Sequence, residues 1–202
     1  MTRISAAARE AMKTELLDLL AGRPIVLVGM MGAGKSTVGR RLAHRLGRTF
    51  ADSDDEIEKA AGMSIADIFA SHGEADFRAG EARVISRLLK ERDLVLGTGG
   101  GAFMNAETRA LVRESALSIF ISADLDVLFA RVSRRSNRPL LKTENPRETL
   151  RQLIETRYPV YREADVTITS RDVPQDVVAT DAIAAMIAHL KKSTEPETAH
   201  AT

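Results

Sequence analysis

Apolar residues recur at two different spacings in the first thirty residues of the chain. Between residues 5 and 20 they fall at helical spacing with charged residues between them, at Met12, Leu16, Leu17, Leu19 and Leu20. Residues 24–28 form a short, continuous apolar run, rich in β-branched residues and bounded by Gly29. A run of this kind is typical of a strand that is buried on both faces. The pattern therefore predicts a helix followed by a buried strand.

The same alternation continues through the rest of the chain. Strand patterns occur at residues 49–51, 94–96, 117–121 and 166–169, and helical patterns at 38–46, 55–61, 65–70, 74–90 and from 176 to about 190. Strands that alternate with helices form parallel sheets covered on both faces. The sequence thus predicts an α/β fold with a five-stranded parallel sheet flanked by helices.

The length of 202 residues suits one domain with short extensions. We expect an N-terminal helical extension over residues 1–23, a single domain over 24–190 and a flexible C-terminal tail over 191–202. Residues 131–148 are polar and rich in arginine, and they contain Asn137-Arg138-Pro139. This composition suits a mobile lid better than a core segment.

Charge and composition exclude several classes of protein. The net charge is +1, from 29 basic and 28 acidic residues, whereas nucleic-acid-binding proteins usually carry a basic excess. There is no cysteine, and therefore no disulfide, thiolate metal site or cysteine nucleophile. No apolar stretch resembles a signal peptide or reaches the roughly 18 residues of a membrane span. We therefore expect a cytoplasmic protein that binds neither nucleic acid nor membrane.

Although the charges balance, the basic residues are biased toward arginine. Arginine supplies 22 of the 29 basic residues, and its guanidinium binds carboxylate and phosphate groups with two parallel hydrogen bonds. Genomic base composition can produce the same excess. Only the positions of individual arginines can therefore carry a functional argument.

A phosphate-binding motif follows the first predicted strand. Residues 29–36 read Gly-Met-Met-Gly-Ala-Gly-Lys-Ser, which matches G-x-x-x-x-G-K-[ST]. In such a loop the glycines let backbone N–H groups surround phosphate oxygens, Lys35 reaches the β- and γ-phosphates, and Ser36 can bind Mg²⁺. Because a helix pattern follows directly, the motif predicts binding of ATP or GTP.

Two aspartates are the candidates for binding a metal ion and the acceptor of the phosphoryl group. The strand at 94–96 ends in Gly-Thr-Gly-Gly-Gly and carries no acid, but Asp52 and Asp54 follow the strand at 49–51. On an extended segment, residues two apart project to the same side, toward the edge of the sheet where ligands bind. One could serve a metal ion and the other a hydroxylated acceptor. Alternatively, both only cap the next helix.

Further motifs follow the phosphate loop in a fixed order. They are Phe-Ala-Asp-Ser-Asp at residues 50–54, Ser-Ile-Ala-Asp-Ile-Phe at 64–69, Gly73-Glu74, Phe77-Arg78, Gly-Gly-Gly at 99–101, Arg-Pro-Leu-Leu at 138–141 and Arg-Tyr-Pro-Val-Tyr at 157–161. In this order, across residues 24–190, the set resembles the shikimate kinase family. The resemblance implies a nucleoside-monophosphate-kinase-like P-loop fold. It also implies transfer of the ATP γ-phosphoryl group to the 3-hydroxyl of shikimate, on the route to chorismate and the aromatic amino acids.

The resemblance also implies roles for individual residues. Asp54 matches the aspartate that binds the shikimate hydroxyls and acts as the base, while Arg78 and Arg157 match the arginines that bind the carboxylate. Catalysis would further involve Lys35 and Arg138, the latter from the lid. The glycines matched to the acceptor pocket are Gly99, Gly100 and Gly101. The implied ATP contacts are Gly32, Ala33, Gly34, Lys35, Ser36, Thr37, Arg131, Arg138 and Pro174, and the implied Mg²⁺ contacts are Ser36 and Asp52.

Two other functions stay open on the sequence. One is a related small-molecule kinase, acting on gluconate or a nucleoside monophosphate. The other is a non-catalytic module in which ATP or shikimate binding signals to a partner. In the leading interpretation the partners are ATP and shikimate alone, with Mg²⁺ as cofactor, and the protein is a monomer. Phe69 and Phe77 are expected in the core.

Overall fold

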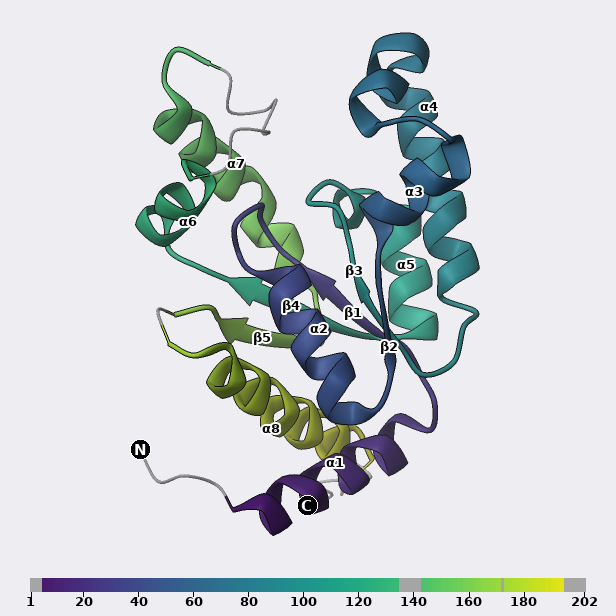
Figure 1. Cartoon of the computed structure of the whole chain (residues 1–202), viewed down its shortest axis with the longest axis vertical. Helices are drawn as coiled ribbons and strands as arrows, with labels where there is room; N and C mark the ends of the chain where they lie inside the picture. The colour runs from purple at the N-terminus through teal and green to yellow at the C-terminus, as the bar shows by residue number, and fades with distance from the viewer. Residues whose placement is uncertain (1–4, 135–142, 172, 195–202) are drawn as a thin grey trace, which may run out of the picture.

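A five-stranded parallel sheet forms the centre of the computed structural model, which describes residues 5–134, 143–171 and 173–194 (Figure 1). The strands are β1 (Ile25–Val28), β2 (Thr49–Asp52), β3 (Leu94–Gly97), β4 (Leu117–Ser122) and β5 (Val166–Thr169), in the order β2-β3-β1-β4-β5. Every strand pair is parallel. All strands therefore end at the same edge of the sheet, and the phosphate motif follows the middle strand.

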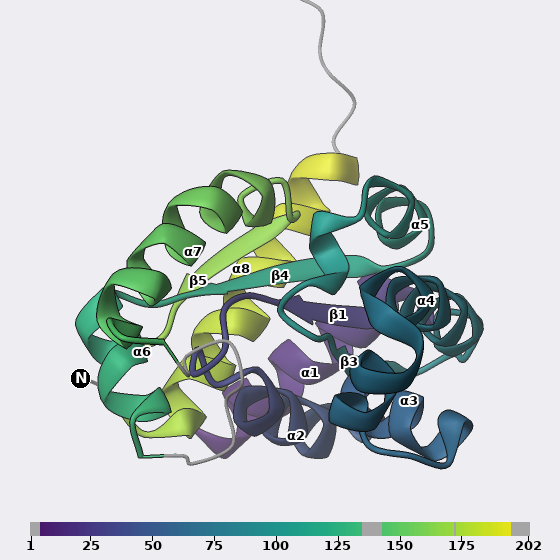
Figure 2. The ribbon, with the colours of Figure 1, turned by 90° about the horizontal axis from the view of Figure 1, so that it is seen from above.

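Helices cover both faces of this sheet, as the alternating pattern predicts. They are α1 (Ala6–Leu20), α2 (Lys35–Leu46), α3 (Ser53–Ala61), α4 (Ile65–Leu88), α5 (Ala106–Ser115), α6 (Leu125–Val132), α7 (Pro146–Tyr161) and α8 (Gln175–Thr194), with a short 3₁₀ turn at Ala102–Met104. Figure 2 shows α5 and α7 on one side of the sheet and α1 and α2 on the other. Because both faces are covered, β1 and β3 are buried along their whole length.

Several boundaries differ from the sequence expectations. Helix α2 begins at Lys35 rather than at residue 38, so the last two motif residues form its first turn. Helices α5, α6 and α7 were not predicted, although the core-facing residues of α7, from Leu150 to Tyr161, fall at helical spacing. Helix α8 continues to Thr194, four residues beyond the expected end of the domain.

The expected lid is helical at both of its ends. Arg131 and Val132 close α6, and residues 146–148 form the first turn of α7. Residues 135–142, which include Arg138, lie outside the described part of the chain. The lid therefore stays a prediction.

A kink at Gly73 divides α4 into the two helices that the sequence predicts. Gly73 has φ 79° and ψ 177°, a conformation that side chains with a Cβ rarely adopt. Beyond the kink Phe77 is buried, but Phe69 is 37% exposed and stacks on Phe77 with ring centroids 4.5 Å apart. The expectation of a core position is thus confirmed for Phe77 and wrong for Phe69.

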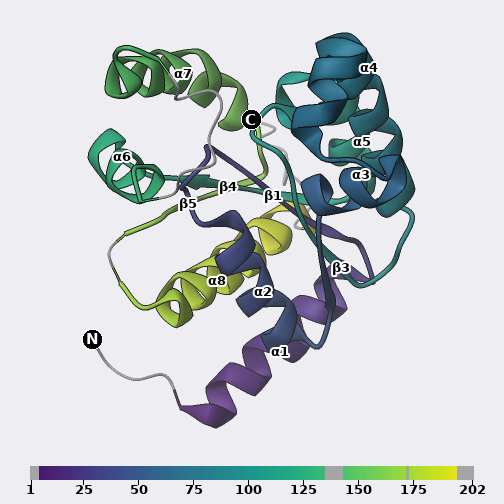
Figure 3. The ribbon, with the colours of Figure 1, turned by 45° about the horizontal axis from the view of Figure 1, so that its top comes forward.

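Helix α1 shares the hydrophobic core of the sheet, although it precedes the first strand. Leu16 and Leu20 have no exposed surface and belong to the main apolar cluster. Helix α1 lies against α8 (Figure 3), and Glu15 forms an ion pair with Lys191 at this contact. The N-terminal extension is therefore a packed part of the domain.

We expect Leu16→Ala to lower the free energy of unfolding by about 2–5 kcal/mol, since it removes a fully buried side chain and leaves a cavity. Thr14→Ala, an exposed change on the same helix, should stay within about 0.5 kcal/mol. Urea denaturation of both variants measures the difference. Equal midpoints for Leu16→Ala and the wild type would contradict the packing of α1.

No helix among the described residues is both long enough and apolar enough to cross a membrane.

Candidate active site

The phosphate motif adopts a backbone shape that requires glycine. Gly34, which precedes α2, has φ 99°, and a Cβ atom at Gly29 would lie 2.6 Å from the carbonyl oxygen of Ile121. Lys35 Nζ donates hydrogen bonds to the carbonyl oxygens of Gly29 at 2.9 Å and Met30 at 3.1 Å. The loop therefore places an ammonium group and the positive end of α2 at one place, an arrangement suited to phosphate.

Asp52 joins the phosphate loop to the next strand. Its Oδ2 accepts a hydrogen bond of 2.8 Å from Ser36 Oγ, and its Oδ1 accepts one of 3.2 Å from the backbone N–H of Asp54. Asp52 thus contacts the motif serine and also caps α3. Asp54 lies in the first turn of α3, so the expected extended segment ends at Asp52. The helix turn, and not the strand pleat, sets the direction of Asp54.

The glycine run after β3 approaches two carboxylates. A Cβ atom at Gly99 would lie 2.6 Å from Asp54 Oδ1 and 3.0 Å from Glu81 Oε1. The Gly99 N–H donates a 2.9 Å hydrogen bond to Ser53 Oγ, which fixes this approach. Only glycine fits at residue 99 without displacing the carboxylates.

The next two glycines approach the two predicted carboxylate-binding arginines. A Cβ atom at Gly101 would overlap the Arg78 guanidinium, and one at Gly100 would lie 3.3 Å from Arg157 Nη1. Arg157 Nη1 also donates a 3.2 Å hydrogen bond to the Gly100 carbonyl oxygen. The turn at 99–101 therefore gathers groups from α3, α4 and α7.

Glu81 is a site residue that the sequence analysis missed. Arg78 Nη1 donates a 2.7 Å hydrogen bond to Glu81 Oε2, and Glu81 is only 3% exposed. Burial raises the pKa of Glu81, and the charge of Arg78 only partly offsets this effect. Burial also opposes the charge of Arg78, but its bonds to Glu81 and Glu74 outweigh burial and raise its pKa. Arg78 and Glu81 are three residues apart on one helix, and this spacing is the sequence signal for the pair.

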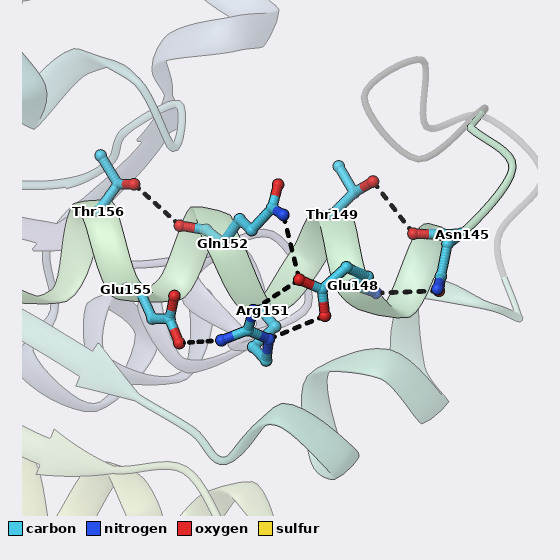
Figure 4. A network of polar contacts seen from close by, with 7 residues as sticks. All are labelled: Asn145, Glu148, Thr149, Arg151, Gln152, Glu155 and Thr156. Carbon is cyan, nitrogen blue, oxygen red and sulfur yellow. Dashed lines mark hydrogen bonds and ion pairs between the residues drawn. The ribbon is translucent and has the colours of Figure 1, made fainter.

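Helix α7, which carries Arg157, is held by a polar network along its first half (Figure 4). Asn145 Oδ1 accepts a 3.2 Å hydrogen bond from the Glu148 N–H and caps the helix. Arg151 binds Glu148 with two hydrogen bonds of 2.8 and 2.6 Å and also contacts Glu155. These groups are exposed, so each pair stabilises the helix only slightly. Together they favour the helical state of the segment that presents Arg157.

A cavity of about 580 Å³ lies between the phosphate loop, the first turn of α3 and the glycine turn after β3. It is lined by Met31, Gly32, Gly34, Lys35, Ser36, Thr37, Asp52, Asp54, Asp55, Thr98, Gly99, Gly100, Arg131, Val132 and Arg134. In Figures 1 and 3, α3 and α4 rise from one side of the sheet edge and α6 and α7 from the other. The predicted phosphate, metal and hydroxyl-binding residues thus share one cavity.

Arg131 connects the phosphate loop to the loop after β5. Its Nη1 donates hydrogen bonds to Ser170 Oγ at 2.8 Å and to the Gly32 carbonyl oxygen at 3.3 Å, and its Nη2 donates to the Arg171 carbonyl oxygen at 3.3 Å. Pro174 lies in the same loop, immediately before α8. Arg131 therefore contacts both the phosphate loop and the loop that contains Pro174, the other residue predicted near the adenine.

The oxygen atoms of Ser36 and Asp52 suit a hard divalent cation. Mg²⁺ is usually held by one or two protein groups together with substrate phosphates. Among the described residues, no cluster of three His, Asp or Glu side chains could hold a metal ion by itself. The donor set fits Mg²⁺ delivered with a nucleotide.

Comparison with known proteins gives the family of the chain. The family model described as shikimate kinase matches residues 31–187. The chain belongs to the shikimate kinase family. A curated shikimate kinase of Rhodopseudomonas palustris is 57% identical over 182 residues, which cover 90% of each chain. The family resemblance predicted from the ordered motifs is confirmed.

Solved structures agree with this family membership. The chain superposes on a shikimate kinase from Acinetobacter baumannii, solved in complex with shikimate, with a TM-score of 0.79 at 39% identity, covering 90% of this chain and 99% of that one. A gluconokinase from Sinorhizobium meliloti matches with a TM-score of 0.54 at 20% identity, over 86% and 98% of the two chains. The second likeness shows the shared fold alone.

Proposed function

We propose that this shikimate kinase family member transfers the γ-phosphoryl group of ATP to the 3-hydroxyl of shikimate, giving shikimate 3-phosphate and ADP. The observation that carries the proposal is the turn at residues 99–101. There a carboxylate, Asp54, lies against Gly99 and lines the cavity of the phosphate loop, and two guanidinium groups, Arg78 and Arg157, lie against Gly101 and Gly100. A small acid with ring hydroxyls needs these two kinds of group. The reaction belongs to the route to chorismate and the aromatic amino acids.

The acceptor is held by groups of opposite charge. Arg78 and Arg157 bind the carboxylate, while Asp54 accepts hydrogen bonds from the hydroxyls and takes the proton of the attacking 3-hydroxyl. Since the transition state of phosphoryl transfer is loose, orientation of that hydroxyl contributes more than strong basicity. Asp54 therefore acts first as a positioning acceptor and then as the base.

The residues around ATP, the phosphoryl donor, stabilise the negative charge of the phosphates. The backbone N–H groups of residues 32–37 and the Lys35 ammonium surround the phosphates, and Ser36 and Asp52 would hold Mg²⁺. When bound, Mg²⁺ neutralises charge on the β- and γ-phosphate oxygens. Arg138, which lies outside the described residues, is proposed to reach the transferring phosphate from the lid, and Arg131 and Pro174 are proposed to border the adenine.

Release of ADP tests the proposed reaction. The protein is incubated with ATP, Mg²⁺ and, in separate reactions, shikimate, gluconate or a nucleoside monophosphate. Shikimate is expected to stimulate ADP release far above the other acceptors. Faster turnover with gluconate or a nucleoside monophosphate would overturn the shikimate assignment in favour of a related kinase. Tight shikimate binding with turnover no faster than that of Asp54→Asn would favour a non-catalytic sensor.

A pH profile tests the proposed support of Arg78 by Glu81. Because burial raises the pKa of Glu81, its carboxylate should protonate as pH falls through a value above the ordinary glutamate range. Protonation removes the charge that holds Arg78, so the KM for shikimate should rise in this interval. Glu81→Gln should raise KM about tenfold at neutral pH, the size of one charged hydrogen bond, and should remove this rise.

Glu74→Gln is the matched control for this prediction. Glu74 also contacts Arg78, but it is 70% exposed and its contact is longer, at 3.3 Å. Its loss should change KM little. A pH profile of Glu81→Gln that overlays the wild-type profile would contradict the assignment.

The monomeric state and the cytoplasmic location stay predictions from the sequence.

A further inference from the structure

The order of the strands determines on which side of the phosphate loop the nucleoside lies. Asp54 follows β2 and the glycine turn follows β3, and both strands lie to one side of β1. In-line transfer requires the γ-phosphate to face the acceptor. The nucleoside must therefore extend to the opposite side, toward the ends of β4 and β5. The segment there is the β5–α8 loop, whose described residues are 170, 171, 173 and 174.

The β5–α8 loop is attached to the phosphate-binding elements at both ends. Its first residues bind Arg131, which also binds the phosphate loop. Just past its other end, Asp176 in the first turn of α8 accepts hydrogen bonds from Arg41 Nε at 2.5 Å and from Arg41 Nη2. Asp176 also forms an ion pair of 2.9 Å with Arg45 Nη2.

Both arginines belong to α2, the helix that begins inside the phosphate motif. Arg45 extends the contact, since its Nη1 donates a 2.6 Å hydrogen bond to Thr180 Oγ1 one turn further along α8. The hydrogen bond from Arg41 holds the pKa of Asp176 below its usual range, so the carboxylate is charged at neutral pH. Two cations on one carboxylate, one of them bidentate, fix geometry better than an isolated surface pair.

We propose that Asp176, held by Arg41 and Arg45, is a positioning residue that sets the β5–α8 loop against α2 at the spacing that a nucleotide needs. The inference rests on the proposed function only in taking the nucleotide as ATP. Its consequence is selective: losing the contact should weaken nucleotide binding and leave the acceptor side unchanged. A purely structural role for the same ion pairs predicts no such selectivity.

Asp176→Asn tests the inference with two measurements. The Kd for ADP without shikimate, from calorimetry, and the KM for ATP should both rise about 3–10-fold, the scale expected when pre-organisation of a loop is lost. The KM for shikimate and kcat at saturating ATP should stay at wild-type values. An unchanged Kd for ADP, or an equal rise in both KM values, would overturn the proposal.

Glu15→Gln is the matched control. It also replaces a carboxylate by an amide in an ion pair of α8, but at the other end of the helix, and the exposed fractions of the two acidic side chains are similar, 39% and 43%. It should leave the Kd for ADP unchanged. A rise equal to that of Asp176→Asn would show that general loosening of α8 is the cause, and would sink the proposal.

A double-mutant cycle tests whether Asp176 acts through its contact with Arg41. Arg41→Gln should weaken ADP binding in the same direction, and the double variant with Asp176→Asn should be no weaker than the worse single variant, because each change breaks the same contact. Additive effects would overturn the pairing. Failure of this proposal and failure of the proposed function give different results. A wild type that binds ADP without phosphorylating shikimate would overturn the proposed function. The ADP measurements would still decide the role of Asp176.

Discussion

Lys35→Ala is expected to lower kcat for phosphoryl transfer by about 10³-fold or more, the scale found when a charge-stabilising group is removed from a transition state. The Lys35 ammonium lies at the carbonyl oxygens of Gly29 and Met30, inside the loop that surrounds the phosphates. Charge on the transferring group spreads over its oxygen atoms in the transition state, and no other lysine lines the cavity as described. The coupled ADP-release assay with shikimate measures the loss.

Lys35 also stabilises the shape of the loop, so the variant needs a control for folding. Lys35→Met keeps the aliphatic stem but removes the ammonium, and it should lose as much activity as the alanine variant. Lys59→Ala, which removes an exposed ammonium from α3, should keep wild-type turnover. Retention of more than about a tenth of kcat by both Lys35 variants would contradict a transition-state role.

Asp54→Asn should lower kcat by about 10²–10⁴-fold, the range for a positioned general base. Asparagine has nearly the same shape, so the approach of residue 54 to Gly99 can persist while the negative charge is lost. The amide can still accept a hydrogen bond from a hydroxyl, but it cannot take its proton. We therefore expect a smaller change in the KM for shikimate than in kcat.

Glu56→Gln is the control for Asp54→Asn. It removes a carboxylate from the same first turn of α3, where both acids interact favourably with the helix N-terminus. Glu56 is paired with Lys59 and Arg87, away from the glycine turn. If Glu56→Gln lost as much activity as Asp54→Asn, the effect would come from the helix and not from the acceptor site.

The elements that sequence patterns predicted well are those whose signals are local. The buried strand at Ile25–Val28 and the glycine loop after it are both encoded within a dozen residues. Helix α7 was not predicted, although Leu150, Leu153, Ile154, Tyr158 and Tyr161 fall at helical spacing and pack on the core. The extended pattern does not predict the direction of the Asp54 side chain correctly. Asp52 caps α3, so the strand ends before Asp54 is reached.

The sequence by itself determined the parallel α/β architecture, the phosphate loop and, through the ordered motifs, the family. Periodicity, turn residues and a contiguous motif depend on short-range backbone geometry, which a chain carries before it folds. Only the tertiary structure decided which side chains share the site. Arg157 meets Gly100 across 57 residues and Asp176 meets Arg41 across 135, and Glu81 becomes buried beside Arg78. Such contacts depend on the packing of whole helices against the sheet, which no local pattern records.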